Sequence, residues 1–300
     1  MTSLTLALHA GVERALGRSL TWRLGRWLYL GSRRELVNDP EVNGEYALQD
    51  WLLDAGLDGV VVDVGANLGE WTLRLAGAAQ ARGRGSLTLH AFEPAPAQRE
   101  TLIQRLAERA GAEAFTVDGR ALGAQAGLTE LAVHGASAGS NALVSGGVHP
   151  TGAQLVEITV ATLDQVCAER GYPDLLLVKV DTEGNDFNVI RGADGLFERE
   201  AIAVLQFEYN WRWLGFGHAL RHVFDRFEGG PYRLGKLTAD GVEFYDRWHP
   251  ELDRYTETNY VVVHPRALAA IPHWRADFDR FNAVALGALA RPPAPPIGGG

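Results

Sequence analysis

Cysteine is nearly absent from the sequence, since Cys167 is the only one among 300 residues. A single cysteine excludes an intrachain disulfide framework and a four-thiolate zinc site, and it is typical of a reducing compartment, so we expect a cytoplasmic protein. No apolar run approaches the roughly 20 residues that a membrane-spanning helix needs. The first apolar stretch also lacks a basic segment before it, which argues against a signal peptide.

Positive charge is also in short supply. The chain has 28 lysines and arginines against 37 acidic residues, a formal net charge of -9. A general nucleic-acid binder needs a basic surface, so we expect no nucleic-acid partner. Hydrophobic residues make up 46% of the chain, which is enough for a large core. The length fits either two domains or one α/β domain with extensions, and we favour the second.

Residues 12–34 depart from this charge balance because six arginines are interspersed there with large apolar residues. The spacing predicts a basic amphipathic helix in an N-terminal helical extension, residues 1–44. Its ordinary role would be to pack on the main domain. The alternatives are contact with a partner or a lipid surface, capping of a substrate, and formation of a homo-oligomer through these helices.

Beyond residue 59, short runs rich in Val, Leu and Ile alternate with segments of helical spacing. The runs are 60–63, 86–92, 174–181 and 201–208, and the helical segments are 70–79, 96–110, 162–170 and 185–191. This alternation is typical of βαβ units. The sequence therefore predicts a doubly wound, mostly parallel, Rossmann-like α/β sheet, which we assign to residues 45–264.

Two segments do not follow the alternation. Residues 128–134 and 155–160 are alternating runs around a Gly/Ser-rich loop, 135–152, which predicts an inserted β-hairpin. That loop either closes over a ligand or is a surface loop without a role. Residues 265–300 are assigned to a C-terminal helix and a Pro/Gly-rich tail that is too poor in apolar side chains to pack.

The clearest local signal is a strand that runs into a glycine-containing turn and then a helix, Val60-Val-Val-Asp-Val-Gly-Ala-Asn-Leu-Gly-Glu-Trp-Thr72. Gly65 allows a tight turn and close approach of a ligand, and Gly69 lets the helix start against the sheet. Asn67 stands where a dinucleotide fingerprint has a second glycine next to the pyrophosphate. This substitution disfavours a nicotinamide-dependent oxidoreductase.

The second strand ends at Glu93-Pro94. A carboxylate at this place can accept hydrogen bonds from both hydroxyls of a ribose. Asp63 and Glu93 would then flank one crevice without a phosphate cradle, which suits S-adenosylmethionine with its ribose, ammonium and sulfonium groups. The alternative is a helix-capped turn beside a solvated acid.

A third group of charges follows the 174–181 run. Lys179 and Asp181 are two residues apart on one strand and therefore face the same side, and Glu183 and Asp186 come directly after it. The carboxyl edge of a central strand is the expected position for a ligand site in an open α/β sheet. Alternatively, Lys179 neutralises Asp181 or Glu208 in the core.

The ordered motifs Asp63-Val-Gly-Ala-Asn-Leu-Gly69, Phe92-Glu-Pro94, Thr162-Leu-Asp164, Val178-Lys-Val-Asp-Thr-Glu-Gly184 and Val189-Ile-Arg-Gly192 resemble those of the FkbM family of S-adenosylmethionine-dependent methyltransferases. The resemblance covers roughly residues 45–264. It implies a seven-stranded methyltransferase fold and methyl transfer, most often to oxygen, on a small-molecule natural product or a sugar. Some members methylate nitrogen in peptides. Asp186 departs from the family pattern, which has Glu there.

The residues and the resemblance together predict the site. The cofactor-binding residues would be Asp63, Gly65, Ala66, Asn67, Gly69, Glu93, Pro94 and Asp181; the catalytic residues would be Asp181, Lys179, Glu208 and His218; the substrate-binding residues would be Glu183, Tyr209, Trp211 and Trp213. The candidate bases, in order of preference, are Asp181, Glu208 and His218. The aromatic residues are equally suited to a core. We expect no required metal, and the alternative from another class is a catalytically silent binding or assembly protein.

Overall fold

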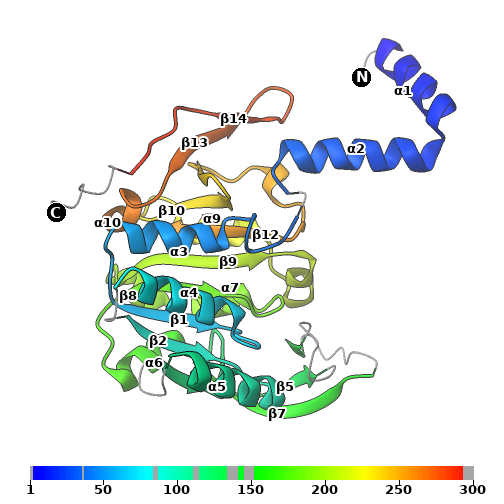
Figure 1. Cartoon of the computed structure of the whole chain (residues 1–300). Helices are drawn as coiled ribbons and strands as arrows, with labels where there is room; N and C mark the ends of the chain where they lie inside the picture. The colour runs from blue at the N-terminus through cyan, green and yellow to red at the C-terminus, as the bar shows by residue number, and fades with distance from the viewer. Residues whose placement is uncertain are drawn as a thin grey trace. The chain divides into compact units, whose positions relative to one another are not determined.

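The computed structural model describes residues 3–35, 37–83, 87–110, 115–133, 141–144 and 152–292, which divide into two compact units, residues 1–39 and 40–300. The first unit contains α1 (Ser3–Leu16) and α2 (Arg18–Ser32) (Figure 1). The sequence predicted one helix over 12–34. Gly17 lies between the two helices with a φ of 76°, a left-handed value at which an α-helix cannot continue.

The second unit is built on a ten-stranded mixed sheet (Figure 1). Its strand order is β14 (Val284–Leu286), β13 (His273–Phe278), β11 (Gly241–Tyr245), β10 (Arg233–Thr238), β12 (Thr258–Val263), β9 (Ile202–Tyr209), β8 (Leu175–Val180), β1 (Val60–Val64), β2 (Thr88–Phe92) and β3 (Phe115–Asp118). The five strands from β9 to β3 are parallel, whereas β12, β10 and β11 pair antiparallel. The predicted seven-stranded, mostly parallel sheet is corrected to this larger mixed one.

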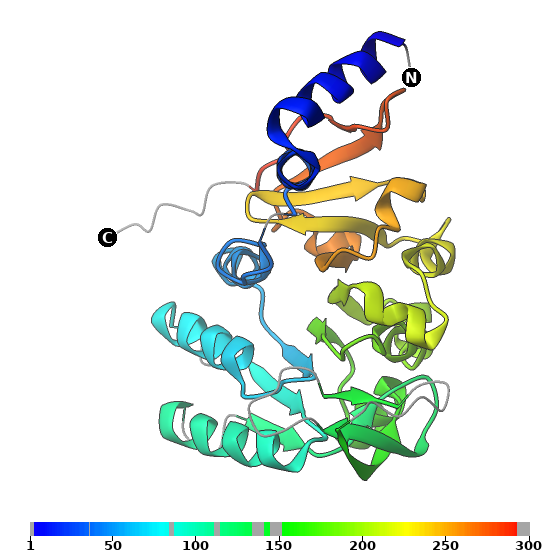
Figure 2. The ribbon, with the colours of Figure 1, turned by 90° about the vertical axis from the view of Figure 1, so that its right-hand side faces the viewer.

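Helices cover both faces of the parallel half, which confirms the doubly wound arrangement. On one face lie α3 (Glu45–Asp54), α4 (Glu70–Ala81) and α5 (Pro96–Ala110), and on the other α6 (Leu163–Arg170), α7 (Asp186–Arg191), α8 (Asp194–Glu198) and α9 (Leu220–Phe227) (Figure 2). Thr162 caps α6 as its side chain accepts a hydrogen bond from the Gln165 amide. Each face carries its own apolar core.

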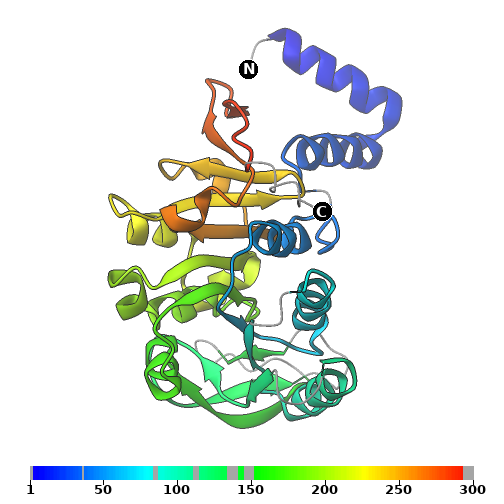
Figure 3. The ribbon, with the colours of Figure 1, turned by 60° about the vertical axis from the view of Figure 1, so that its left-hand side comes forward.

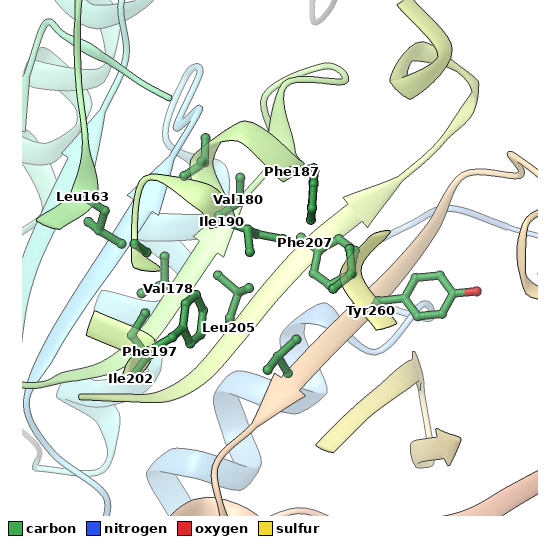
Figure 4. Close-up of a cluster of buried hydrophobic side chains, with 14 of the residues drawn as sticks. Leu163, Val178, Val180, Phe187, Ile190, Phe197, Ile202, Leu205, Phe207 and Tyr260 are labelled. Atoms are coloured by element: carbon green, nitrogen blue, oxygen red, sulfur yellow. The ribbon is translucent and has the colours of Figure 1, made fainter. Parts of the chain in front are cut away.

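The core beneath α6, α7 and α8 shows how β8 is buried. Side chains from these helices, from β8 and β9 and from β12 meet in one cluster (Figure 4), of which Leu163, Val178, Val180, Phe187, Ile190, Phe197, Ile202, Leu205, Phe207 and Tyr260 are members. Val178 and Val180 face this cluster, so Lys179 between them points to the opposite face. A lysine in a central strand contradicts the local apolar pattern, and such conflicts are typical of functional sites.

A second sheet of four strands has the order β4 (Ala121–Leu122), β7 (Gln154–Ala161), β5 (Gly127–Val133), β6 (Ala142–Leu143). It lies beside the end of the main sheet that carries β2 and β3 (Figure 3). β7 pairs antiparallel with the whole length of β5, which confirms the predicted hairpin. Most of the predicted loop, 135–152, lies outside the described residues.

The C-terminal segment differs from its prediction as a helix and tail. Among residues 265–292, only α10 (Pro265–Leu268) is helical, and β13 and β14 then extend the main sheet through parallel pairing of β13 with β11. Backbone hydrogen bonds to the exposed edge of β11 explain this, because an unpaired edge is a template for another strand. Residues 293–300 lie outside the described part of the chain. No helix in the described part is long and apolar enough to cross a membrane.

Candidate functional site

A cavity lies at the carboxyl ends of β1, β2 and β8. Between β1 and β8 the chain order of the parallel strands reverses, and such a switch point is where open α/β sheets bind ligands. The cavity has an empty volume of about 670 Å³ including the solvent at its mouth. Its lining consists of Val64, Gly65, Asn67, Phe92, Glu93, Pro94, Arg120, Ala121, Leu122, Leu131, Asn141, Leu143, Asp181, Thr182, Glu183 and Asn185. Six of the predicted site residues are therefore brought together: Gly65, Asn67, Glu93, Pro94, Asp181 and Glu183.

The turn after β1 closes tightly against the turn after β8. Gly65 has a φ of 81°, and a Cβ at this position would lie 2.0 Å from the carbonyl oxygen of Asp181. Only glycine fits such a contact, so the wall at this point is bare backbone. Gly69, with a φ of 86°, starts α4 where a Cβ would lie 2.4 Å from the Leu102 side chain of α5. Gly69 therefore positions two helices and does not line the cavity.

The Glu93 carboxylate is fixed by backbone amides. Its Oε2 accepts a hydrogen bond from the Asn67 amide at 2.8 Å and its Oε1 accepts one from the Ala95 amide at 2.8 Å. Burial raises the pKa of Glu93 and these two bonds oppose that rise. A carboxylate has about four acceptor positions, so each oxygen can accept one further hydrogen bond from a ligand.

A row of buried polar groups lies behind the cavity wall. Asp63 on β1 and Gln206 on β9 are in register with Lys179 on β8. Lys179 Nζ lies 3.2 Å from Asp181 Oδ2 and 3.6 Å from Asp63 Oδ1. Thr72 donates to the other oxygen of Asp63 at 2.5 Å. This arrangement confirms that Lys179 and Asp181 share a side of the strand.

The surroundings of Lys179 favour its charged ammonium form. Burial disfavours the charge, but Asp181, Asp63 and Glu45 together raise the pKa of Lys179 above its ordinary value. Since Asp181 also lines the cavity, the lysine connects the buried row to the site. Its Nζ lies 6.0 Å from the centre of the Trp71 ring on α4.

The turn after β8 presents Glu183 to the cavity. Glu183 has a φ of 56°, a value that non-glycine residues rarely adopt, and the Arg212 guanidinium lies 3.0 Å from its Oε2. Burial and the neighbouring charge of Asp181 raise the pKa of Glu183 to about 7, although Arg212 opposes the rise. Asp186 stabilises the turn by accepting bonds from the Thr182 amide at 3.4 Å and the Gly184 amide at 3.2 Å.

Several predicted residues lie elsewhere. Tyr209 and Trp213 are 1% and 0% exposed and belong to the apolar core, so they pack and do not contact an acceptor as predicted. Trp211 is 59% exposed but is not part of the cavity lining, and neither are Glu208 and His218. Asn210 donates to Glu208 at 2.6 Å, and His218 lies 3.2 Å from the Asn188 side-chain oxygen.

Three other predicted residues support the wall from behind. Asp63, Ala66 and Lys179 are buried and do not line the cavity. Lys179 contacts Asp181 at 3.2 Å and Asp63 at 3.6 Å. These three predicted residues therefore lie outside the cavity lining.

Sequence reasoning missed the polar residues that come from distant segments. Glu45 on α3 accepts bonds from Gln206 at 3.0 Å and Asn259 at 3.2 Å and adds negative charge near Lys179. Asn185 donates to the Leu122 carbonyl at 2.9 Å and so joins α7 to the second sheet. In the sequence, only Asn185 could have been recognised as a site residue, because it follows the Glu183-Gly184 turn. The contacts of Glu45 join residues that are far apart in the sequence.

No group of three or more His, Cys, Asp or Glu side chains within the described ranges is arranged to hold a metal ion. The expectation that no metal is required stays a prediction. The cavity is instead lined by carboxylates that are held by Lys179, Arg212 or backbone amides.

Comparison with protein families identifies one family for this chain. A model of the FkbM methyltransferase domain matches residues 63–237. No curated protein sequence matches the chain. A methyltransferase FkbM from Methylobacillus flagellatus has a similar structure, with 17% identity over 82% of this chain and 60% of that one and a TM-score of 0.45. An S-adenosylmethionine-dependent methyltransferase from Agrobacterium tumefaciens has 10% identity over 74% of this chain and 61% of that one, with a TM-score of 0.40. The matched region thus spans about 60% of each of these two chains.

Proposed function

This chain belongs to the FkbM methyltransferase family, and on that basis we propose that it transfers a methyl group from S-adenosylmethionine to a hydroxyl oxygen of a natural product or a sugar. One observation carries the proposal: Gly65, Glu93 and Asp181 line a single cavity at the carboxyl edge of the sheet. Asn67 occupies the place where a pyrophosphate would need glycine, so the wall suits a donor without one.

The residues present fit this cofactor. Glu93 keeps acceptor capacity for ribose hydroxyls, and the bare backbone at Gly65 allows a ligand to approach closely. The carboxylates of Glu93 and Asp181 suit the positive charge of an ammonium and a sulfonium. When bound, S-adenosylmethionine supplies an activated methyl group for in-line displacement.

Glu183 is suited to accept the proton of the acceptor hydroxyl. A base works best when its pKa is near the operating pH, and the pKa of Glu183 is raised to about 7 by burial and by Asp181. Asp181 is instead held by the Lys179 ammonium at 3.2 Å, which fixes its orientation. We therefore assign proton transfer to Glu183 and positioning to Asp181, in place of the predicted order Asp181, Glu208, His218.

The second sheet supplies the opposite wall. Leu131 and Leu143 are apolar, whereas Asn141 and Arg120 offer polar groups. Arg120 is held in place by Asp118 at 2.8 Å and Glu169 at 2.9 Å. A few fixed polar groups among apolar side chains suit a small molecule that has both apolar surface and hydroxyls.

Calorimetry tests the cofactor. We expect S-adenosylmethionine and S-adenosylhomocysteine to bind and NAD to give no signal. Tight binding of NAD without any response to the other two would overturn the proposal. A panel of polyketides, sugars and peptides then tests the acceptor, with the methylated atom located by mass spectrometry and NMR. Methylation of a peptide nitrogen would overturn the oxygen assignment, and cofactor binding without turnover on any acceptor would favour a silent binding protein.

A matched pair of variants tests the base. Glu183→Gln should lower kcat roughly 10²–10⁴-fold and remove the rise of kcat with pH near pH 7, because the neutral amide cannot accept the proton. Glu208→Gln, outside the cavity lining, should retain most of the activity. A larger loss in Glu208→Gln than in Glu183→Gln would refute the assignment.

A further inference from the structure

The two helices of the N-terminal unit, residues 1–39, leave most of their large apolar side chains exposed. α1 and α2 contain no buried residue. Apart from the half-buried Leu30, their large apolar side chains are between 41% and 68% exposed, among them Leu4, Leu8, Leu20, Trp22, Trp27 and Leu28. Contiguous exposed apolar surface on this scale marks an interaction site.

Part of the exposed apolar residues form faces, whereas Leu6, Trp22 and Tyr29 lie on the other sides of their helices. Trp22 lies on the arginine side of α2, with its ring centre 5.6 Å from the Arg26 guanidinium. In α2, Leu20, Leu24, Trp27 and Leu28 follow the spacing i, i+4, i+7, i+8, which places them along one side of the helix. In α1, Leu4, Leu8 and Val12 do the same. These two stripes are the apolar faces of the unit.

The charge of this unit indicates what covers the faces. Residues 1–39 contain six arginines and three acidic residues, a net charge of +3, so residues 40–300 carry −12 of the total of −9. In α2 every charged residue is an arginine: Arg18, Arg23 and Arg26. Helical positions place Arg18 and Arg26 away from the stripe that holds Leu20 and Leu24. An apolar face with Trp and Leu opposite an arginine-rich face is the pattern of a helix that lies in a membrane interface.

A second copy of the chain is a poorer occupant. Two α2 helices packed through their stripes would leave Arg18 and Arg26 on the outer sides of the pair, with no acidic residue of α2 to pair with them. The stripe also extends over only about two turns, because α2 begins after Gly17 and ends at Ser32, whereas a coiled coil needs three or more heptads. Anionic lipid headgroups supply the missing negative charge, and the acyl boundary receives the Leu and Trp side chains.

We propose that α1 and α2 bind the surface of an anionic lipid bilayer, with their apolar faces inserted at the headgroup boundary and the arginines of α2 near the headgroups. Each arginine near such a surface is expected to strengthen binding about fivefold, and the effect falls with salt. The proposal concerns attachment to one surface of a bilayer and is independent of the methyl-transfer proposal.

The test uses the full chain and sedimentation with vesicles. We expect binding to vesicles of phosphatidylcholine mixed with phosphatidylserine, and much weaker binding to phosphatidylcholine alone. Leu24→Ser combined with Trp27→Ser and Leu28→Ser should lower the partition coefficient at least about tenfold, because each lost apolar side chain removes buried area. Replacing Arg18, Arg23 and Arg26 with Gln should remove the preference for the anionic vesicles. All six side chains belong to helices without buried residues, so the fold should be retained, which circular dichroism checks.

Phe281→Ser is the matched control, since Phe281 is 73% exposed but lies in the other unit, and it should bind vesicles like the unchanged chain. The proposal is overturned if the chain binds neither kind of vesicle, if it binds both equally, or if the Phe281 variant loses as much as the triple variant. It is also overturned if ultracentrifugation shows a dimer that the triple serine variant dissociates while vesicles bind none of the proteins.

Discussion

Lys179→Met is the most informative change to the buried polar row. It keeps the length of the side chain and removes the charge that Asp181 and Asp63 face at 3.2 Å and 3.6 Å. At 3.6 Å the attraction to the buried Asp63 is about 5 kcal/mol at an effective dielectric constant near 20, whereas solvent screens much of the attraction to Asp181, whose side chain is 39% exposed. Desolvation offsets much of that sum, and removal of one partner of a buried pair costs roughly 3–5 kcal/mol. We expect the free energy of unfolding at neutral pH to fall by about this amount.

The stability lost in Lys179→Met should increase with pH. Burial raises the pKa of Asp63, and Lys179 is the main group that opposes the rise. Without the lysine, the folded pKa of Asp63 lies further above its unfolded value near 4. Such a group favours folding below the unfolded pKa and loses that contribution as the pH rises through the folded pKa. The deficit of the variant should therefore be smallest in mild acid and grow toward neutral pH.

Urea unfolding followed by tryptophan fluorescence, measured at several pH values, checks both expectations. Asp63→Asn in the Lys179→Met background should recover part of the loss at neutral pH, because it removes an uncompensated buried carboxylate. A cost below about 1 kcal/mol that is the same at every pH would refute the view that Lys179 compensates buried acids.

Three further predictions concern the cavity wall. Gly65→Ala should abolish cofactor binding in calorimetry and lower the free energy of unfolding by more than about 1 kcal/mol, because its Cβ would lie 2.0 Å from the Asp181 carbonyl oxygen. The control Gly77→Ala should do neither, because Gly77 lies in α4 and a Cβ there meets nothing within 4 Å. Equal effects of the two variants would contradict the close approach at Gly65. Glu93→Ala should weaken S-adenosylmethionine binding by about 1.5–3 kcal/mol, and an unchanged calorimetric affinity would exclude the ribose assignment. Asp186→Asn should flatten the pH dependence of the free energy of unfolding measured with urea. Burial raises the pKa of Asp186 to about 8, so its contribution to stability is full below pH 4 and is lost as the pH rises through 8. An unaltered dependence of the unfolding free energy on pH between these values would contradict the raised pKa.

The first half of the domain was predictable because its signals are local. Runs of Val, Leu and Ile mark buried parallel strands, and Gly65 and Gly69 mark a turn that only glycine permits. The antiparallel half of the sheet was not predicted because its signals depend on contacts between distant segments. β10 contains Lys236, which looks like a surface residue until the sheet brings it 3.3 Å from Glu243 on β11. Pairing between strands hides such charges from any reading of one segment alone.

The position of the site residues was likewise predictable from local motifs only in part. Motif order places Glu93, Asp181 and Glu183 at the carboxyl edge, because parallel strands end at one edge. Which of the neighbouring residues face the cavity depends on packing. Tyr209 and Trp213 turn into the core, and Glu183 obtains its raised pKa from burial and from Asp181.

The sequence alone thus established the strand–turn–helix after Val60, the family motifs and the helical, amphipathic character of residues 12–34, although it predicted one helix where the structure has two. Folding in three dimensions established the size and direction of the sheet, the ion pairs of Lys179 and the choice of Glu183 over Glu208 as the residue in the cavity. The physical reason is that the two kinds of signal act over different distances along the chain. Backbone conformation and periodicity act over a few neighbouring residues, whereas burial and electrostatic interactions depend on groups that only the folded chain brings together.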